Sequence, residues 1–196
     1  MKEVTPIHQR IAEALRLQRA ERGLSLEALA QATGVSRSAL SLIERGQSSP
    51  TAIVLDKIAA GLGITLGKLF EQSGRSTDVP VTPLARRAEQ VTWTDPGSGY
   101  VRRAVSPRNF PSSVQLVDVE FPPGARVAFE TVSPTPHFHQ QVWILSGEMT
   151  LVIGEDSWHL KTGDCLAMTL EQPTVFYNPT DRVSRYCVVM VSGIYS

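Results

Sequence analysis

The sequence predicts an α + β protein with two domains, an all-α bundle of five helices followed by an all-β barrel. From residue 8 to residue 70 apolar residues recur every three or four positions, which is the spacing of amphipathic helices. Residues 71–87 are polar and contain two prolines, as linkers do. After residue 91 the pattern alternates or is continuously β-branched, as in strands. We therefore expect domains at 1–72 and 91–196, joined by a linker at 73–90.

Five helices are expected, near residues 7–22, 25–32, 36–44, 51–61 and 65–70. Ser25, Ser36 and Thr51 stand where three of these helices begin. Their side-chain oxygens can accept hydrogen bonds from the free N–H groups of a first helical turn, so we expect them to be N-caps.

Strands are expected at residues 114–121, 142–145, 149–153 and 186–191, with glycines marking turns between them. Short strands at regular spacing are typical of a barrel or a sandwich.

Composition excludes several classes of protein. A hydrophobic share of 42% is ordinary for a folded chain, and no run approaches the roughly 20 apolar residues that span a membrane. The N-terminus lacks a secretion signal, so we expect a soluble cytoplasmic protein with no membrane partner. Two cysteines are too few for a disulfide scaffold, and we expect Cys165 and Cys187 to be buried small side chains.

The net charge is zero, which by itself argues against a protein that coats nucleic acid. The zero is a sum of opposite signs, because residues 1–72 hold nine basic and seven acidic residues, whereas residues 91–196 hold seven and ten. Any nonspecific affinity for DNA should therefore be low.

Residues 24–46 carry the main functional signal. A predicted helix is followed by Gly34, which suits a left-handed turn, then by the apolar Val35, and then by a second helix capped by Ser36. This is the spacing of a helix-turn-helix, whose second helix enters the major groove of DNA. The residues expected to contact bases or phosphates are Ser36, Arg37, Ser38, Ser41, Arg45 and Gln47.

This segment resembles the Xre/Cro-type helix-turn-helix family across about residues 8–72. The matching runs are Leu-Ser-Leu-Glu-Ala-Leu-Ala from Leu24, Gly-Val-Ser-Arg-Ser from Gly34, and Ile-Glu-Arg-Gly from Ile43. The resemblance implies that double-stranded DNA is a partner. Because the positive charge is modest, one copy should bind weakly, and we expect a homodimer that contacts two half-sites. One departure is Leu26, where the family often has a glutamine that contacts phosphate.

The second half resembles a cupin, a small jelly-roll barrel, across about residues 91–196. The resemblance depends on His137 and His139 two residues apart, a Trp-Ile-Leu-Ser-Gly run that ends at Gly147, Gly163 with Asp164, and Asn178. A cupin metal site usually takes two histidines and a glutamate from one motif and a histidine from a second.

Most of those ligands are missing from this chain. The glutamate position falls on Gln140 or Trp143, depending on the direction of counting, and the second-motif histidine position falls on Thr174. His159 is expected to point outward. We therefore expect no metal and no cofactor, although the sequence leaves open whether His137 and His139 hold a metal.

An open barrel interior could bind a small molecule instead. The residues expected to line it are His137, His139, Gln141, Trp143, Thr174 and Phe176, with Arg102 or Tyr100 as further candidates. An amino-acid-like or carboxylate metabolite would fit these walls. The inward-facing set depends on strand register, because a slip of one residue reverses every side chain.

Three interpretations of the function remain. The preferred one is a sequence-specific DNA-binding transcriptional regulator, not an enzyme, whose barrel senses a small-molecule effector and helps to dimerise. The alternative is a cupin enzyme, because the same layout resembles a non-haem-iron epoxidase that carries a helix-turn-helix domain. A barrel used for oligomerisation alone is a third possibility.

Overall fold

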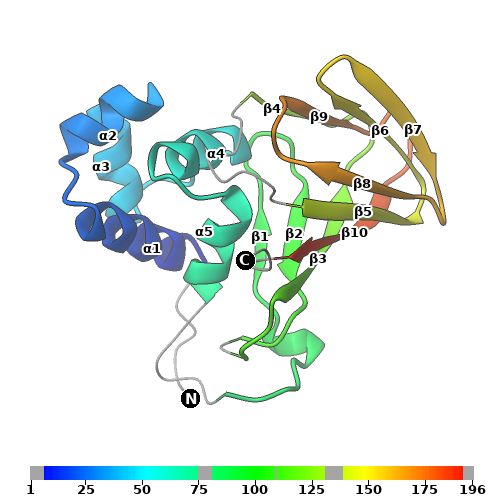
Figure 1. Ribbon diagram of the computed structural model, residues 1–196, viewed down its shortest axis with the longest axis horizontal. Helices are drawn as coiled ribbons and strands as arrows, with labels where there is room; N and C mark the ends of the chain where they lie inside the picture. The colour runs from blue at the N-terminus through cyan, green and yellow to red at the C-terminus, as the bar shows by residue number, and fades with distance from the viewer. Residues whose placement is uncertain (1–6, 75–80, 109, 131–138, 192–196) are drawn as a thin grey trace.

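The computed structural model describes residues 7–74, 81–108, 110–130 and 139–191, without the side chains of residues 71–74. Figure 1 shows its two parts, with the helices on one side and two β-sheets on the other. Within the described residues no helix is both long enough and apolar enough to cross a bilayer.

The helical part agrees closely with the prediction. The capping side chains of Ser25, Ser36 and Thr51 accept hydrogen bonds from the backbone N–H groups three residues later, at 3.0, 3.2 and 3.4 Å. All three caps are therefore confirmed. The helices are α1 (Ile7–Glu21), α2 (Leu26–Thr33), α3 (Arg37–Glu44), α4 (Ala52–Gly61) and α5 (Leu66–Gly74).

The turn between α2 and α3 has the expected left-handed residue. Gly34 has φ of 68°, and its N–H donates to the carbonyl oxygen of Ala30. The turn lets Leu29 of α2 pack with Leu40 and Ile43 of α3, and all three side chains are buried. Burial of these apolar faces fixes α3 against the rest of the bundle.

The β-rich part is a double-sheet barrel of antiparallel strands, as predicted. The larger sheet has the order β1-β2-β3-β10-β5-β8 and the smaller one β4-β9-β6-β7. The strands are β1 (Thr92–Thr94), β2 (Val101–Ala104), β3 (Val114–Phe121), β4 (Arg126–Phe129), β5 (His139–Ser146), β6 (Glu148–Ile153), β7 (Asp156–Lys161), β8 (Cys165–Thr169), β9 (Thr174–Tyr177) and β10 (Ser184–Val191).

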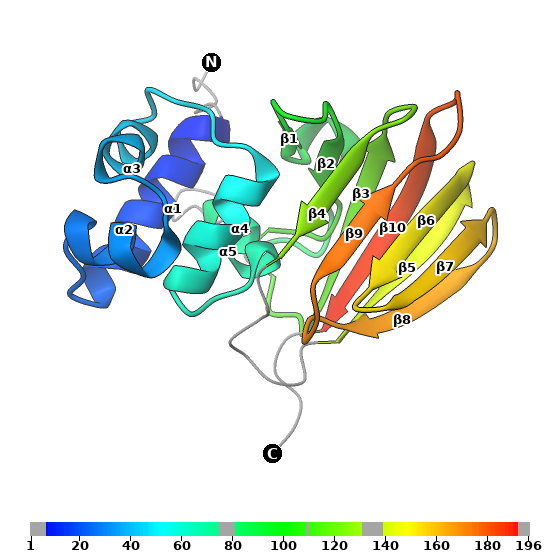
Figure 2. The ribbon, with the colours of Figure 1, turned by 90° about the horizontal axis from the view of Figure 1, so that it is seen from above.

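Helices α4 and α5 pack against the barrel (Figure 2). The Asp95 carboxylate, next to β1, accepts a hydrogen bond of 2.8 Å from the N–H of Ala52, at the start of α4. On α5, a Cβ at Gly67 would lie 2.6 Å from Sδ of Met190 on β10, so an alanine there would have to displace the end of that flexible side chain. One continuous hydrophobic core therefore joins the helices to the barrel.

Two details differ from the prediction. Cys165 is exposed and Cys187 is half-buried, so the expectation of two buried cysteines is wrong. Cys165 is the first residue of β8, which lies at the edge of its sheet, and strand edges are the least covered positions. Of the predicted linker, the described residues 81–90 form a loop and a short 3₁₀ helix, Arg87–Glu89.

Candidate functional site

The N-terminal end of α3 presents a polar face to solvent. Ser36, Arg37 and Ser38 are exposed and Ser41 is half-buried one turn later. The Ser36 hydroxyl caps the helix and also lies 3.1 Å from the Ser38 hydroxyl. The expected base-contacting residues therefore lie together at one end of one helix.

Both arginines of this region are available to a partner. Arg37 lies 3.9 Å from the Glu27 carboxylate, and both side chains are about two-thirds exposed. An exposed pair at that distance is worth only about 0–1 kcal/mol, so DNA phosphate or a base could displace it. Arg45 is exposed and donates through Nε to the carbonyl oxygen of Ser41, and Gln47 is exposed beyond it.

An ion pair that we did not predict holds α3 in place. The Arg19 guanidinium on α1 donates to both carboxylate oxygens of Glu44, at 2.6 and 2.8 Å, and also to the carbonyl oxygen of Leu24. The hydrogen bond to Glu44 raises the pKa of Arg19, against the effect of burial. Glu44 belongs to the Ile-Glu-Arg-Gly run, so its place in that run is the sequence signal for this role.

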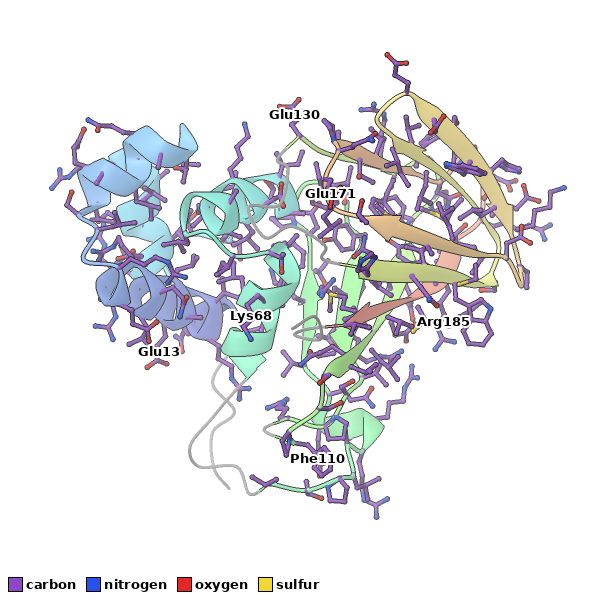
Figure 3. All side chains as sticks on the ribbon, viewed as in Figure 1. Glu13, Lys68, Phe110, Glu130, Glu171 and Arg185 are labelled. Carbon is purple, nitrogen blue, oxygen red and sulfur yellow. The ribbon has the colours of Figure 1, made fainter. Side chains whose placement is uncertain are left out.

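A pocket lies between the helical part and the barrel. Its helical wall comes from α4, the turn after it and the start of α5, and its other wall comes from both sheets. Its volume is about 100 Å³, on a scale where one water needs roughly 10–15 Å³. Figure 3 shows the side chains of α5, Lys68 among them, together with those of the strands beside it.

Two of the predicted effector-binding residues line this pocket. Thr174 and Phe176 on β9 are buried on its wall, as is the further candidate Tyr100, and the half-buried Arg102 lines it as well. His137 lies outside the described residues.

The remaining three, His139, Gln141 and Trp143, are exposed on the outer face of β5, so their inward placement is wrong. Neighbouring residues of a strand point to opposite faces, and the assumed register was off by one residue. The inward residues of β5 are Gln140, Val142 and Ile144.

The sequence prediction missed Gln140, Tyr186 and the whole helical wall. The sequence did contain a signal for which residues of β5 face inward. The β-branched residues at positions 142 and 144 favour burial of the even-numbered side chains of this strand. No local pattern could have placed α4 and α5 on the pocket.

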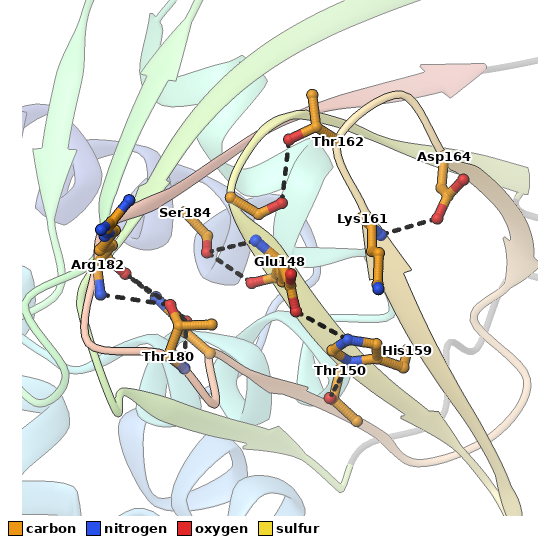
Figure 4. A network of polar contacts seen from close by, with 11 residues as sticks. Glu148, Thr150, His159, Lys161, Thr162, Asp164, Thr180, Arg182 and Ser184 are labelled. Carbon is orange, nitrogen blue, oxygen red and sulfur yellow. Dashed lines mark hydrogen bonds and ion pairs between the residues drawn. The ribbon is translucent and has the colours of Figure 1, made fainter.

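His159 points away from the pocket, as predicted. It lies on β7, where its Nε2 is 2.9 Å from a carboxylate oxygen of Glu148 and its Nδ1 is 3.4 Å from the Thr150 hydroxyl (Figure 4). Its side chain is 46% exposed. These contacts are cross-strand pairs on the outer surface of the smaller sheet.

Burial controls the protonation of the pocket's polar groups. It raises the pKa of the Tyr100 and Tyr186 phenols, which therefore stay neutral and able to donate hydrogen bonds. It also lowers the pKa of Arg102, although a guanidinium begins so high that it remains charged.

The described pocket wall does not fit a divalent metal ion. Gln140 and Thr174, at two of the expected ligand positions, are neutral, Asp56 is the one carboxylate among the described lining residues, and the Arg102 guanidinium would repel a cation. No cluster of three or more His, Cys, Asp or Glu side chains suited to a metal occurs among residues 7–74, 81–108, 110–130 and 139–191.

The family model for helix-turn-helix domains, HTH_3, matches residues 15–69. Residues 15–69 are an HTH_3 helix-turn-helix domain. The HTH_3 domain contains α2, the turn at Gly34, and α3 with its exposed polar end.

Known relatives extend this similarity. The chain is 50% identical over 54 residues to the HTH-type transcriptional regulator SutR of Escherichia coli K12, a match that covers 28% of this chain and 30% of SutR. It is 25% identical over 169 residues to the HTH-type transcriptional regulator PuuR of the same organism, which covers 85% of this chain and 86% of PuuR.

A solved structure shows the same fold over both parts of the chain. It is an HTH_3 family transcriptional regulator from Vibrio cholerae, with a TM-score of 0.71 and 24% sequence identity. The alignment covers 96% of this chain and 98% of that one, so the HTH_3 domain and the barrel occur together there as well.

Proposed function

We propose that this chain is a sequence-specific, DNA-binding transcriptional regulator whose barrel senses a small-molecule effector, and that it acts in the cytoplasm as a homodimer. The observation that carries the proposal is the exposed polar end of α3 within an HTH_3 domain. The names of SutR and PuuR as transcriptional regulators support it. In this proposal residues 1–72 bind DNA and residues 91–196 sense and dimerise.

The recognition helix is α3. Its first turn would enter the major groove, where Arg37 can donate two hydrogen bonds to guanine and Ser36, Ser38 and Ser41 can contact base edges or phosphate. Arg45 and Gln47 follow the helix and would hold the phosphate backbone.

The small positive charge of the helical part explains why a dimer is expected. Few basic side chains mean few phosphate contacts, so one copy binds DNA weakly at physiological salt. Two copies that contact half-sites about one helical turn apart would combine their affinities.

The position of the pocket supports sensing. A ligand there would contact α4, α5 and the barrel, so it could favour one arrangement of the two parts over another. A barrel used for oligomerisation alone would not need buried polar side chains around a cavity. No set of described residues favours the enzyme alternative, because the expected ligand positions hold Gln140 and Thr174.

Selection of DNA by the purified full-length protein tests this proposal. Random fragments are enriched with and without a library of small metabolites, with a parallel selection that lacks protein as the control. We expect a two-part site with half-sites about one turn apart, and enrichment that changes with at least one metabolite. Fragments that match the control selection would contradict DNA recognition, and enrichment that no metabolite alters would contradict sensing.

A further inference from the structure

The polar side chains that line the junction pocket include those of Tyr100, Arg102, Gln140 and Tyr186. Tyr100, Gln140 and Tyr186 are 5%, 8% and 4% exposed, and Arg102 extends between them and α5. The two phenol hydroxyls form no hydrogen bond within the described part of the chain. Both phenol residues line the pocket, so a molecule bound there could supply hydrogen-bond partners for these hydroxyls.

Arg102 contacts an aromatic ring and a methionine sulfur. Its guanidinium carbon lies 4.8 Å from the centre of the Phe70 ring on α5, and one nitrogen lies 4.0 Å from Sδ of Met190. No carboxylate among the described residues pairs with it. By contrast Arg103, the next residue of β2, forms an ion pair with Asp118. Arg102 is half-buried and forms no ion pair among the described residues, so an anion would stabilise it more than a neutral ligand of the same size.

The rest of the wall limits the kind of anion. Phe121, Phe129 and Phe176 contribute an aromatic surface for an apolar body. One guanidinium and neutral donors offset a single negative charge, and a phosphate dianion would leave a second charge buried. Asp56, on the helical wall, already has an interaction of its own.

We propose that the pocket binds a small organic carboxylate, whose anionic group is held by Arg102 and by the hydroxyls of Tyr100 and Tyr186. The apolar part of the ligand lies against the phenylalanines. This assignment rests on the proposed sensing function and gives it a chemical class.

The site also explains how a ligand would reach the DNA-binding part. Arg102 is in contact with Phe70 on α5, and Phe70 in turn lies 5.1 Å, between ring centres, from Trp93 on β1. A carboxylate bound to Arg102 therefore lies beside the contact that joins α5 to the barrel. Its binding free energy depends on how α5 is seated, which is the requirement for a ligand to shift that arrangement.

Calorimetric titration and thermal shift of the full-length protein test the assignment. The probes are butyrate, hexanoate, benzoate and phenylacetate, each compared with the amine and the amide of the same carbon skeleton. We expect at least one carboxylate to bind at millimolar concentration or below, and its amine and amide to bind more weakly. Preferred binding of the amines, or no binding of any carboxylate, would overturn the assignment.

Three variants locate the site. Arg102→Met should weaken the best carboxylate by roughly tenfold or more, and Tyr186→Phe, which removes one hydroxyl and keeps the ring, by roughly fivefold. Arg126→Gln, an exposed arginine of β4, is the matched control and should change nothing. Equal affinity in Arg102→Met and the wild type would overturn the assignment, and Tyr186→Phe decides the question if Arg102→Met does not fold.

The outcome can be separated from that of the proposed function. DNA selection without any ligand tests recognition by α3 alone. If a DNA site is selected and no carboxylate binds, the ligand class is wrong and the regulator stands. If a carboxylate binds through Arg102 and no DNA site is selected, the regulator is wrong and the anion site stands.

Discussion

At the scale of single residues, DNA specificity depends on a few side chains at the start of α3. Arg37 is the strongest of these candidates, because a guanidinium can donate two parallel hydrogen bonds to guanine. Its one described ion-pair partner is Glu27, at 3.9 Å on an exposed surface. Releasing Arg37 from that carboxylate costs little, so the side chain is free to contact DNA.

Arg37→Ala should therefore weaken binding to the selected DNA site by roughly tenfold to a hundredfold, since one bidentate base contact is worth about 1–3 kcal/mol. The free energy of unfolding should stay within about 0.5 kcal/mol of the wild-type value, because the lost ion pair is exposed. Fluorescence anisotropy with labelled duplex measures the first quantity, and urea unfolding measures the second. Glu27→Gln is the control and should not weaken binding, and unchanged DNA affinity in Arg37→Ala would remove Arg37 from the recognition surface.

Predictions about single residues succeeded where the interaction that decides them involves residues close in the sequence. Ser25, Ser36 and Thr51 cap helices because the hydrogen bond reaches only three residues along the chain. The prediction for Gln141 and Trp143 failed because orientation in a strand depends on pairing with distant strands. On β5 that pairing is with β8 and β10, and it places both residues outside.

At the scale of secondary-structure elements, the Arg19–Glu44 ion pair holds the recognition helix. It joins α1 to the last residue of α3 through two hydrogen bonds, and both side chains are at most one-fifth exposed. Removing one partner of a shielded pair leaves the other charge without compensation. The orientation of α3, and with it the polar end that faces DNA, depends on this contact.

Glu44→Gln should lower the free energy of unfolding by about 1–3 kcal/mol, because Arg19 keeps its size-matched neighbour and loses the anion. Urea unfolding followed by circular dichroism measures the change. Glu27→Gln removes a similar carboxylate from an exposed pair and should change the value by less than about 0.5 kcal/mol. Equal effects of the two substitutions would show that the Arg19–Glu44 pair does not hold α3.

The longer secondary-structure elements were predicted more completely than the short ones, although β7 and β8, of six and five residues, were not among the expected strands. The helices cover two to four turns, so their period is visible, and β3 was found with its observed bounds, Val114–Phe121. Strands β1, β4 and β9 have three or four residues, which is too short to show alternation. They exist because neighbouring strands pair with them, and a single sequence does not contain that information.

At the scale of the whole molecule, the helices and the barrel share one core. Asp95 accepts hydrogen bonds from the N–H of Ala52, at the start of α4, and from both the backbone and the hydroxyl of Ser98. The carboxylate lies at the positive end of the helix dipole, where it is favoured. This contact and the close approach of Gly67 to Met190 seat the helices on the barrel.

The contact between Gly67 and Met190 can be tested with a double-mutant cycle. Gly67→Ala should destabilise the wild type by less than about 1 kcal/mol, because its Cβ would overlap Sδ of Met190, the end of a flexible side chain that can move. In a Met190→Ala background the same change should be neutral or stabilising, because alanine is the better helix residue by about 0.5–1 kcal/mol. Urea unfolding of the four proteins gives the coupling, and additive effects would contradict the close approach.

The pocket could be predicted only in part. Thr174, Phe176, Tyr100 and Arg102 were candidates because barrel interiors bind ligands. The contribution of α4 and α5 depends on how the helical part packs against the barrel. The hydrophobic periodicity of either part alone does not predict that packing. The zero net charge likewise concealed a slightly basic helical part joined to a slightly acidic barrel.

The central claim is that a ligand in the junction pocket alters DNA binding through α3. Fluorescence anisotropy of the full-length protein on its selected DNA site, titrated with the tightest-binding carboxylate, tests it most directly. We predict a change in DNA affinity of roughly fivefold or more, which is the lower range of allosteric coupling, and no change in Arg102→Met. The same DNA affinity with the pocket empty and saturated would contradict the account.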